Sequence, residues 1–412
     1  MGQYQNKQRN KPHSAVMTIA LCFLIALSEG IDLQTAGVAA PGIAATFGLD
    51  KSSLGLFFSA AVLGLLPGGL IGGRLADRIG RQKVLIISVT VFGFFSIATA
   101  WVNSFWLLLC IRFMTGLGMG AALPNLVALV SEVVSEQARG RAISFMYCGM
   151  PVGGIIISLL ASKLATTDWK VIFYVGGTLP LITIPFMLLF LPESPAFLSH
   201  KSNPDTAQSL RFKTLFNPDF RLATTLLWVG YFFTMLVVYV MFNWLPSVLM
   251  ELGFQNHQAN IVQMFFAIGA FFGTLGLGLL IDHWKMNYVI IMMYSGIVVG
   301  LLALSSFKVL YSMYFAAALV GCFTIGAQMV LYAIGSQVYP TQIRGTGLGS
   351  AMSIGRVGAI LGPALVGQFM LMGNGLSSVI FTSIPSIVIA AILILALSRN
   401  MHKQGHLPQS LH

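Results

Sequence analysis

Residues 63–78 read LGLLPGGLIGGRLADR, and residues 268–283, which lie 205 positions later, read IGAFFGTLGLGLLIDH. Six of these sixteen positions are identical. A second comparison, of SEVVSEQARGRAIS from Ser131 with SQVYPTQIRGTGLG from Ser336, gives five identities in fourteen positions at the same offset. Two distant segments that share one offset indicate that the chain contains two copies of one unit.

The composition is that of a membrane protein. Of the 412 residues, 23 are basic and 12 are acidic, so 8% are charged, against about 25% in an ordinary soluble domain. Hydrophobic residues make up 56% of the chain, and the mean hydropathy is +0.83. A water-soluble fold cannot bury so much apolar surface, which excludes a soluble enzyme, a nucleic-acid-binding protein and a disordered scaffold. The four cysteines are scattered without a CxxC spacing, which indicates neither disulfides nor a zinc site.

Twelve apolar runs are long enough to cross a bilayer as helices, which takes about 20 residues each. The sequence therefore predicts an all-α membrane protein with transmembrane helices at approximately 15–40, 53–75, 83–102, 105–130, 141–163, 171–191, 222–250, 259–281, 287–306, 309–333, 345–371 and 376–398. One polar stretch, 192–221, divides these runs six and six. We expect a six-helix bundle within 1–191, a central loop at 192–221 and a second six-helix bundle within 222–412.

The basic residues predict how the chain is oriented. The termini and the even-numbered connections carry 17 of the 23 lysines and arginines, the other side carries four, and Arg112 and Arg356 lie within spans. Because cytoplasmic loops are enriched in basic residues, we expect both termini and the central loop to be cytoplasmic. The net charge of +11 then reflects topology, and we expect no nucleic-acid partner.

The duplication also favours one class of function. A copy with six helices returns the chain to the same side of the membrane, so the two copies are parallel repeats related by an axis along the membrane normal. Transporters built in this way bind their substrate near the midplane, between the two halves. The pattern therefore predicts an alternating-access transporter and argues against a channel.

Three motifs resemble those of a known family. Residues 73–83, GRLADRIGRQK, are similar to the signature between the second and third helices of the major facilitator superfamily, and residues 112–120 resemble its fourth-helix motif, R-x-x-x-G-x-G-x-G. Residues 29–32, EGID, resemble the D-G-x-D motif of its aromatic acid:H⁺ symporter family. Here Glu29 stands where that family usually has Asp, which moves the carboxylate by one methylene. The resemblance covers essentially the whole chain.

The resemblance implies proton-coupled uptake of an aromatic carboxylate of the hydroxyphenylpropionate, hydroxycinnamate or benzoate type. Protons would be the coupling ion, with no other cofactor and no metal, and the partners would be the lipid bilayer and the small substrate of a monomeric protein. The resemblance also implies a cytoplasmic gate, for which the candidates are Asp77, Arg78, Arg81, Glu132, Arg139 and Arg344. For Arg78 and Arg81 the alternative is plain anchoring on the positive side of the membrane.

Four charges lie deep within the predicted spans, where each costs about 3 kcal/mol on insertion scales. Glu29 and Asp32 are three residues apart and share one helix face. Burial and mutual repulsion can hold one of them protonated near neutral pH, as a proton carrier requires, so both are candidates for proton coupling. The alternative is that they only brace the helix through hydrogen bonds.

The other two buried charges are arginines. Arg112 has the same predicted depth as Asp32, so it can pair with one of the two acids. Arg356 lies in the other half, with no obvious intramembrane acid nearby, which favours it as the cation that meets a substrate carboxylate. Both arginines could instead only lock helices together. Further candidates for substrate binding are polar or aromatic side chains within spans, each of which could also serve packing alone: Asn125, Tyr147, Asn243, Gln328 and Tyr332.

Three rival functions can be compared with this one. A proton-driven drug exporter of the same superfamily would carry a G-P-x-x-G-G signature in its fifth helix, whereas residues 149–154 read GMPVGG with the proline displaced, which argues against export. A symporter of a ring-cleavage dicarboxylate is an alternative that these motifs leave open. An enzyme with an intramembrane site has no support, because the sequence contains neither HExxH nor GxSxG.

Overall fold

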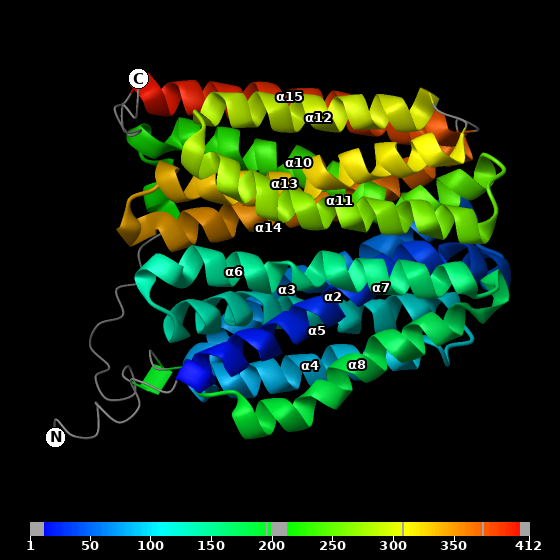
Figure 1. The fold of residues 1–412 in the computed structure, drawn as a ribbon, viewed down its shortest axis with the longest axis horizontal. Coiled ribbons are helices and arrows are strands. Elements are labelled where there is room, and N and C mark those ends of the chain that lie inside the picture. The colour runs from blue at the N-terminus through cyan, green and yellow to red at the C-terminus, as the bar shows by residue number, and fades with distance from the viewer. Residues whose placement is uncertain (1–11, 195–196, 199–211, 307–308, 373–374, 404–412) are drawn as a thin grey trace.

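A computed structural model of the chain describes residues 12–194, 197–198, 212–306, 309–372 and 375–403. The described residues form long α-helices, and twelve helical segments are long and apolar enough to cross a membrane. The prediction of an all-α membrane protein with twelve spans is therefore confirmed. The helices lie nearly parallel in two groups, one formed by the first half of the chain and one by the second (Figure 1).

The first group holds the helices that precede the polar central stretch: α2 (Pro12–Phe47), α3 (Lys51–Ile79), α4 (Arg81–Thr99), α5 (Phe105–Val133), α6 (Arg139–Tyr147), α7 (Gly149–Lys163) and α8 (Trp169–Phe190). The second group holds α10 (Pro218–Glu251), α11 (Asn256–His283), α12 (Met286–Ser306), α13 (Leu310–Val338), α14 (Thr341–Leu371) and α15 (Gly375–Lys403). Short 3₁₀ turns occupy η1 (Glu136–Ala138), η2 (Thr166–Asp168) and η4 (Phe212–Phe216).

Most helices extend beyond the apolar runs that predict them. The seventh span begins at Pro218, before the expected run of 222–250, because proline suits the first turn of a helix, where its missing N–H has no partner to lose. At the start of α3, the carboxylate of Asp50 accepts a hydrogen bond from the Ser53 backbone N–H at 2.7 Å. This cap begins the helix at Lys51, still outside the apolar run.

The fifth span is interrupted near its middle. Helix α6 ends at Tyr147 and α7 begins at Gly149, with Cys148 in a turn between them. Pro151 has no backbone N–H, so it cannot donate to the carbonyl of Tyr147 four residues earlier. The interruption therefore follows from the GMPVGG sequence, and it lies beside Gly30, where an added Cβ would overlap the backbone of Met150.

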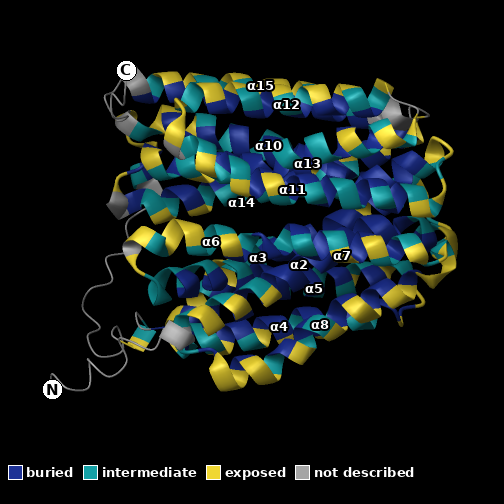
Figure 2. Ribbon diagram, in the orientation of Figure 1, coloured by how far each residue is buried: buried dark blue, intermediate teal, exposed yellow. Residues whose placement is uncertain are grey.

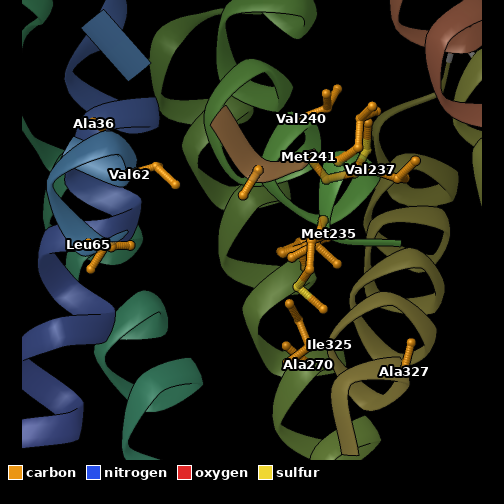
Figure 3. Close-up of a cluster of buried hydrophobic side chains, with 14 of the residues drawn as sticks. Ala36, Val62, Leu65, Met235, Val237, Val240, Met241, Ala270, Ile325 and Ala327 are labelled. Carbon is orange, nitrogen blue, oxygen red and sulfur yellow. The ribbon is translucent and has the colours of Figure 1, made fainter. Parts of the chain in front are cut away.

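Apolar side chains cover the outside of the bundle. Leu189 is 75% exposed and Tyr311 80% exposed, and Figure 2 shows exposed residues along the outer helices α8 and α15. In water such surfaces would mark an interaction site, but here they match the hydrocarbon core of a bilayer. Inside the bundle, apolar side chains of both groups are buried, among them Val62 and Leu65 of α3 and Met235 of α10 (Figure 3).

Helix α2 begins and α15 ends at the same end of the bundle, which we call the terminal end (Figure 1). The opposite end, where α2 ends and α3 begins, is the far end. The two groups of helices meet along the pairs α3 and α14, α7 and α11, and α2 and α10. The spans that carry the buried charges therefore line the boundary between the two halves or lie directly behind it.

Candidate substrate and proton site

Asp32 of α2 and Arg112 of α5 form a buried ion pair inside the N-terminal half. Both terminal nitrogens of Arg112 donate to the carboxylate, Nη1 to Oδ1 and Nη2 to Oδ2, each at 3.1 Å. The hydroxyl of Ser96 donates to Oδ1 at 2.8 Å. The charges of Asp32 and Arg112 neutralise each other in this bidentate geometry, which is the strong form of the interaction.

The surroundings of this ion pair are closed and apolar. The side chains of Asp32 and Arg112 are each 1% exposed. The guanidinium carbon lies 5.4 Å from the centre of the Phe173 ring and 6.0 Å from that of Phe57, so cation–π attraction adds to the pair. Of the possible acid partners of Arg112, the structure therefore selects Asp32.

Glu29 has a different environment, although it lies on the same face of α2. The residue is 2% exposed, and its Oε1 has no hydrogen-bond partner among the described residues. The charges that act on Glu29 are those of Arg356, which attracts it, and Asp32, which repels it. The expectation that no intramembrane acid lies near Arg356 is therefore wrong, because the sequence does not show that Glu29 of one half lies within electrostatic range of an arginine of the other.

Arg356 joins the two halves. It belongs to α14, and its Nη1 donates to the carbonyl oxygen of Leu65 on α3 at 2.7 Å. Gly69 leaves room for this guanidinium, since an added Cβ would stand 2.8 Å from Nη1. The arginine is half-buried, so it combines a fixed position with access from the space between the halves.

Tyrosines from both halves surround the charges of Glu29 and Arg356. Tyr147, at the end of α6, lies within electrostatic range of Glu29, Arg356 and Tyr332 of α13. Tyr239 of α10 lies within the same range of Arg356 and Glu29. Four of the predicted site residues, Glu29, Arg356, Tyr147 and Tyr332, thus lie together. An arginine among aromatic side chains is a chemical match for an aromatic carboxylate.

The predicted amide ligands lie elsewhere or bind backbone. Asn125 donates to the carbonyls of Ala121 at 2.8 Å and Gly72 at 3.4 Å, so it ties α5 to α3. Asn243 donates to the carbonyl of Tyr239 at 2.7 Å, within its own helix. Gln328 of α13 is half-buried. The amide groups of Asn125 and Asn243 thus donate to backbone carbonyls, which favours a role in helix packing over contact with substrate.

Beyond Arg356, the two halves are closed toward the far end. Along the antiparallel pair α3 and α14, Ser59 donates to the carbonyl of Ile360 at 2.7 Å, and Gln368 donates to the Ser52 hydroxyl at 2.5 Å. Gly55 and Gly367 allow this approach, because a Cβ on Gly55 would stand 2.8 Å from the Pro363 carbonyl oxygen. The contact between these helices is therefore continuous from Arg356 to the far end.

A set of polar contacts, which we call the far-end bridge, joins the remaining helices across the boundary. Gln263 of α11 donates to the amide oxygen of Gln34 on α2 at 3.3 Å, and Ser158 of α7 donates to the same oxygen at 3.3 Å. The other bridge contacts join Asn256 to the carbonyl of Leu164 at 3.2 Å, and Lys51 to Glu251 in an ion pair. Polar groups at a boundary between halves can be wetted when the halves separate, which an apolar seam would resist.

Toward the terminal end the same helices diverge. Gly73 lies one helical turn after Gly69 on α3, yet a Cβ added to it would meet no heavy atom within 4 Å. Gly345 and Gly349 of α14 likewise face open space. The region around Glu29 and Arg356 is therefore closed from the far end and opens toward the terminal end.

The predicted gate residues lie at this open end. Asp77, Arg78 and Arg139 are exposed. Arg81 pairs with Glu132, whose other oxygen accepts from the Ser194 hydroxyl at 2.6 Å. Two further gate residues bind backbone: Arg139 donates to the Ser131 carbonyl at 2.9 Å and Arg344 to the Tyr339 carbonyl at 3.4 Å. These contacts lie within one half each, as expected where the halves are apart.

Sequence reasoning missed the far-end bridge. Gln34 and Gln263 are amides inside long apolar runs, which is the signal that selected Asn125 and Asn243. That signal cannot tell an amide that joins two halves from one that joins neighbouring helices. Among the described residues, no three His, Cys, Asp or Glu side chains gather as a metal site would require.

Comparisons with known proteins agree with this architecture. The sequence profile of the Major Facilitator Superfamily matches residues 22–363. The chain is 47% identical to a 3-(3-hydroxy-phenyl)propionate transporter of Escherichia coli (strain K12), over 93% of this chain and 94% of that protein. It is 33% identical to the 4-hydroxybenzoate transporter PcaK of Pseudomonas putida, over 84% of each chain.

Among solved structures, the crystal structure of a D-xylose-proton symporter superposes with a TM-score of 0.75 at 18% identity, over 92% of this chain and 97% of that one. At this identity the similarity concerns the fold. Together with the twelve spans, these relatives make the protein a multi-pass transporter of the bacterial inner membrane and not an enzyme. The chain therefore belongs to the major facilitator superfamily, in the part of it that contains these aromatic acid transporters.

Proposed function

We propose that this protein takes up an aromatic carboxylate together with protons, by alternating access. The observation that carries the proposal is that a buried acid with an unpaired oxygen, Glu29, lies within electrostatic range of an arginine of the other half, Arg356, and of tyrosines. The relatives that transport 3-(3-hydroxyphenyl)propionate and 4-hydroxybenzoate support the substrate class. Each half supplies part of the site, so one chain is sufficient and the transporter acts as a monomer.

In this proposal the substrate and Glu29 compete for Arg356. With the site empty, the Arg356 guanidinium attracts the charged form of Glu29. A substrate carboxylate that binds Arg356 takes over that cation, and Glu29 then stands buried without a counter-charge. A buried carboxylate in that situation takes up a proton. Binding of the substrate anion to Arg356 therefore requires that Glu29 takes up a proton. This couples the movement of substrate to that of protons, although the substrate does not contact the proton carrier.

Asp32 has a structural role in the same scheme. Its charge is already matched by Arg112 and by the Ser96 hydroxyl, so protonation would have to break a bidentate pair. We therefore assign proton carriage to Glu29 and the bracing of α2 against α5 to Asp32.

The direction of opening follows from the basic residues. Because lysines and arginines concentrate on the side of the termini, we assign the terminal end to the cytoplasm. The structure then represents an inward-open state, with the far-end bridge closed on the periplasmic side. In the outward-open state the predicted gate residues, including Asp77 of α3 and Arg344 of α14, would approach one another while the bridge separates.

Uptake by purified protein in proteoliposomes tests this function. We expect radiolabelled 3-(3-hydroxyphenyl)propionate or 4-hydroxybenzoate to accumulate when the outside is more acidic than the inside, and accumulation to collapse with a protonophore. A ring-cleavage dicarboxylate and a lipophilic drug serve as competing substrates for the two rival functions. The proposal is wrong if neither aromatic acid accumulates, or if a dicarboxylate or drug is moved in preference to both.

A further inference from the structure

Two aromatic rings from opposite halves meet on the far-end side of Arg356. The ring centres of Phe58, on α3, and Trp244, on α10, lie 5.1 Å apart with their planes at 80°. Phe58 is 2% exposed and Trp244 is fully buried. This edge-to-face arrangement is favourable for aromatic side chains, and each half contributes one of the two rings.

The contacts around these two side chains fix their depth. The indole nitrogen of Trp244 donates to the Pro363 carbonyl oxygen at 3.0 Å. The same oxygen lies 2.8 Å from a Cβ added to Gly55, three residues before Phe58. The carbonyl that binds Arg356 belongs to the residue seven positions after Phe58, which is about 10 Å nearer the terminal end. The ring pair therefore lies between the charged site and the far end.

Each ring is held by contacts within its own half. Pro363, the partner of the Trp244 indole, belongs to α14 of the same half. In the other half, the ring of Phe58 lies 5.6 Å from that of Phe57, which in turn lies 6.0 Å from the guanidinium of Arg112. These anchoring contacts do not cross the boundary, so they need not change when the far end opens. Only the contact between Phe58 and Trp244 has to break.

Opening affects this ring contact differently from the polar contacts beside it. Ser59 donates to the Ile360 carbonyl of the other half at 2.7 Å and to the Gly55 carbonyl of its own helix at 2.9 Å, so its hydroxyl stays paired when the halves separate. The amides of the far-end bridge can exchange their partners for water. Water does not replace an aromatic ring, because the exposure of apolar surface to water is unfavourable. Opening thus leaves two ring surfaces that face each other without a partner.

We propose that Phe58 and Trp244 form an entry subsite for the aromatic ring of the substrate, which exists only while the far end is open. In this subsite the substrate ring packs between the two side chains and replaces the contact that they make with each other in the closed state. The inference rests on the proposed function, because it presumes alternating access and an aromatic substrate. As the substrate carboxylate reaches Arg356 and the far end closes, the two side chains meet again behind the substrate.

The subsite lets the ring of the substrate favour opening of the far end. A ligand shifts a conformational equilibrium only as far as it binds one state better than the other. Here the substrate ring has Phe58 and Trp244 as partners in the open state alone. The two side chains therefore affect binding from the far end and not binding from the terminal end, from which the closed pair cannot be reached.

The test compares 3-phenylpropionate with 3-cyclohexylpropionate, which has the same charge and chain length but no aromatic ring. Competition with radiolabelled 3-(3-hydroxyphenyl)propionate is measured in right-side-out and in inside-out membrane vesicles, which present the far end and the terminal end respectively. We expect the wild type to prefer the phenyl acid at the far end by about two- to tenfold, as an aromatic pair contributes beyond its buried area. In Phe58→Leu and Trp244→Leu this preference should fall toward unity at the far end and stay unchanged at the terminal end.

Two further variants serve as controls. Trp244→Phe loses the indole hydrogen bond but keeps a ring, so it should retain the preference at the far end. Phe265→Leu removes a ring stacked 4.7 Å from that of Tyr314 within the second half, and it should behave as the wild type does.

The proposal is overturned if the wild type does not distinguish the two acids at the far end. It is also overturned if the leucine variants keep the preference there, or if they change it equally at both ends and so only shape the cavity. If the wild-type vesicles do not take up the radiolabelled acid at all, the proposed function fails instead, which keeps the two failures apart.

Discussion

Arg112 holds Asp32 through two parallel hydrogen bonds of 3.1 Å, in a side-chain environment that is almost completely closed to solvent. One helical turn away, Glu29 has an unpaired oxygen and faces Arg356 of the other half. Two acids on one helix face thus have different surroundings: Asp32 is held by an arginine of its own half, whereas Glu29 lies within electrostatic range of an arginine of the other half.

Asp32→Asn should destabilise the protein. The substitution leaves the Arg112 charge buried without a counter-charge, and loss of one partner of a buried pair typically costs about 3–5 kcal/mol. We expect a clear fall in the melting temperature of the detergent-solubilised protein, partly restored in the double variant Asp32→Asn with Arg112→Gln. Glu29→Gln should melt close to the wild type. Equal melting temperatures for Asp32→Asn and wild type would show that the ion pair does not brace the fold.

Glu29→Gln should uncouple substrate movement from protons. Wild-type uptake should rise as the external pH falls, because loading of Glu29 from the periplasm requires a proton. The variant carries a permanent neutral mimic of the protonated acid, so exchange of substrate across the membrane should persist without accumulation and with little dependence on pH. Counterflow and net uptake measured in the same proteoliposomes separate these steps. Normal accumulation by Glu29→Gln would remove Glu29 as the proton carrier.

Arg356 should recognise the charge of the substrate. Arg356→Gln should weaken binding of the aromatic acid by about a hundredfold, since a buried anion that loses its cationic partner costs about 2–5 kcal/mol. Arg356→Lys should restore binding poorly, because lysine lacks the planar fork of the guanidinium. The uncharged amide of the same acid serves as the control ligand. If acid and amide weaken to the same extent, Arg356 only holds α14 against Leu65 of α3.

Breaking the ion pair between Lys51 and Glu251 should favour opening at the far end. The side chains are 37% and 34% exposed, and such surface pairs contribute about 0.2–1 kcal/mol. Glu251→Gln should therefore raise the fraction of molecules that are open at the far end by no more than about fivefold. The readout is labelling of Ser59→Cys, a buried position at the α14 contact, by an impermeant thiol reagent. The charge-reversed pair Lys51→Glu with Glu251→Lys should restore slow labelling, whereas fast labelling in that variant would argue against an electrostatic latch.

The open faces of Gly73 and Gly349 should meet when the terminal end closes. Along α3 and α14 the closed contacts pair Gly55 with Pro363 and Ser59 with Ile360, and the same antiparallel spacing brings Gly73 to Gly349. With the native cysteines replaced, Gly73→Cys with Gly349→Cys should cross-link only while substrate and protons drive transport. The matched pair Ser59→Cys with Ile360→Cys should cross-link at rest. A Gly73/Gly349 pair that never cross-links during turnover would contradict this closure.

Much of the fold could be predicted from the sequence because a membrane restricts the choices. Each apolar run must satisfy its backbone hydrogen bonds internally, so it becomes a helix. The two matches at one offset, from Leu63 and from Ser131, then predict two parallel halves. The buried charges were also visible, since Glu29, Asp32, Arg112 and Arg356 are the charged residues deep within apolar runs. Their cost in lipid requires that each faces the interior of the bundle.

What the sequence by itself determined is therefore the set of spans and the list of charges that need partners. Only the tertiary structure decided which partner each one has. Asp32 and Arg112 are 80 residues apart, and Arg356 reaches Leu65 over 291 residues, so these contacts depend on how helices from distant parts of the chain pack. The same holds for the far-end bridge: an amide inside an apolar run looks alike in sequence whether it faces its own bundle or the other half. The difference lies in the rotation of each helix about its axis, which is set by the packing of its neighbours and not by its own residues alone.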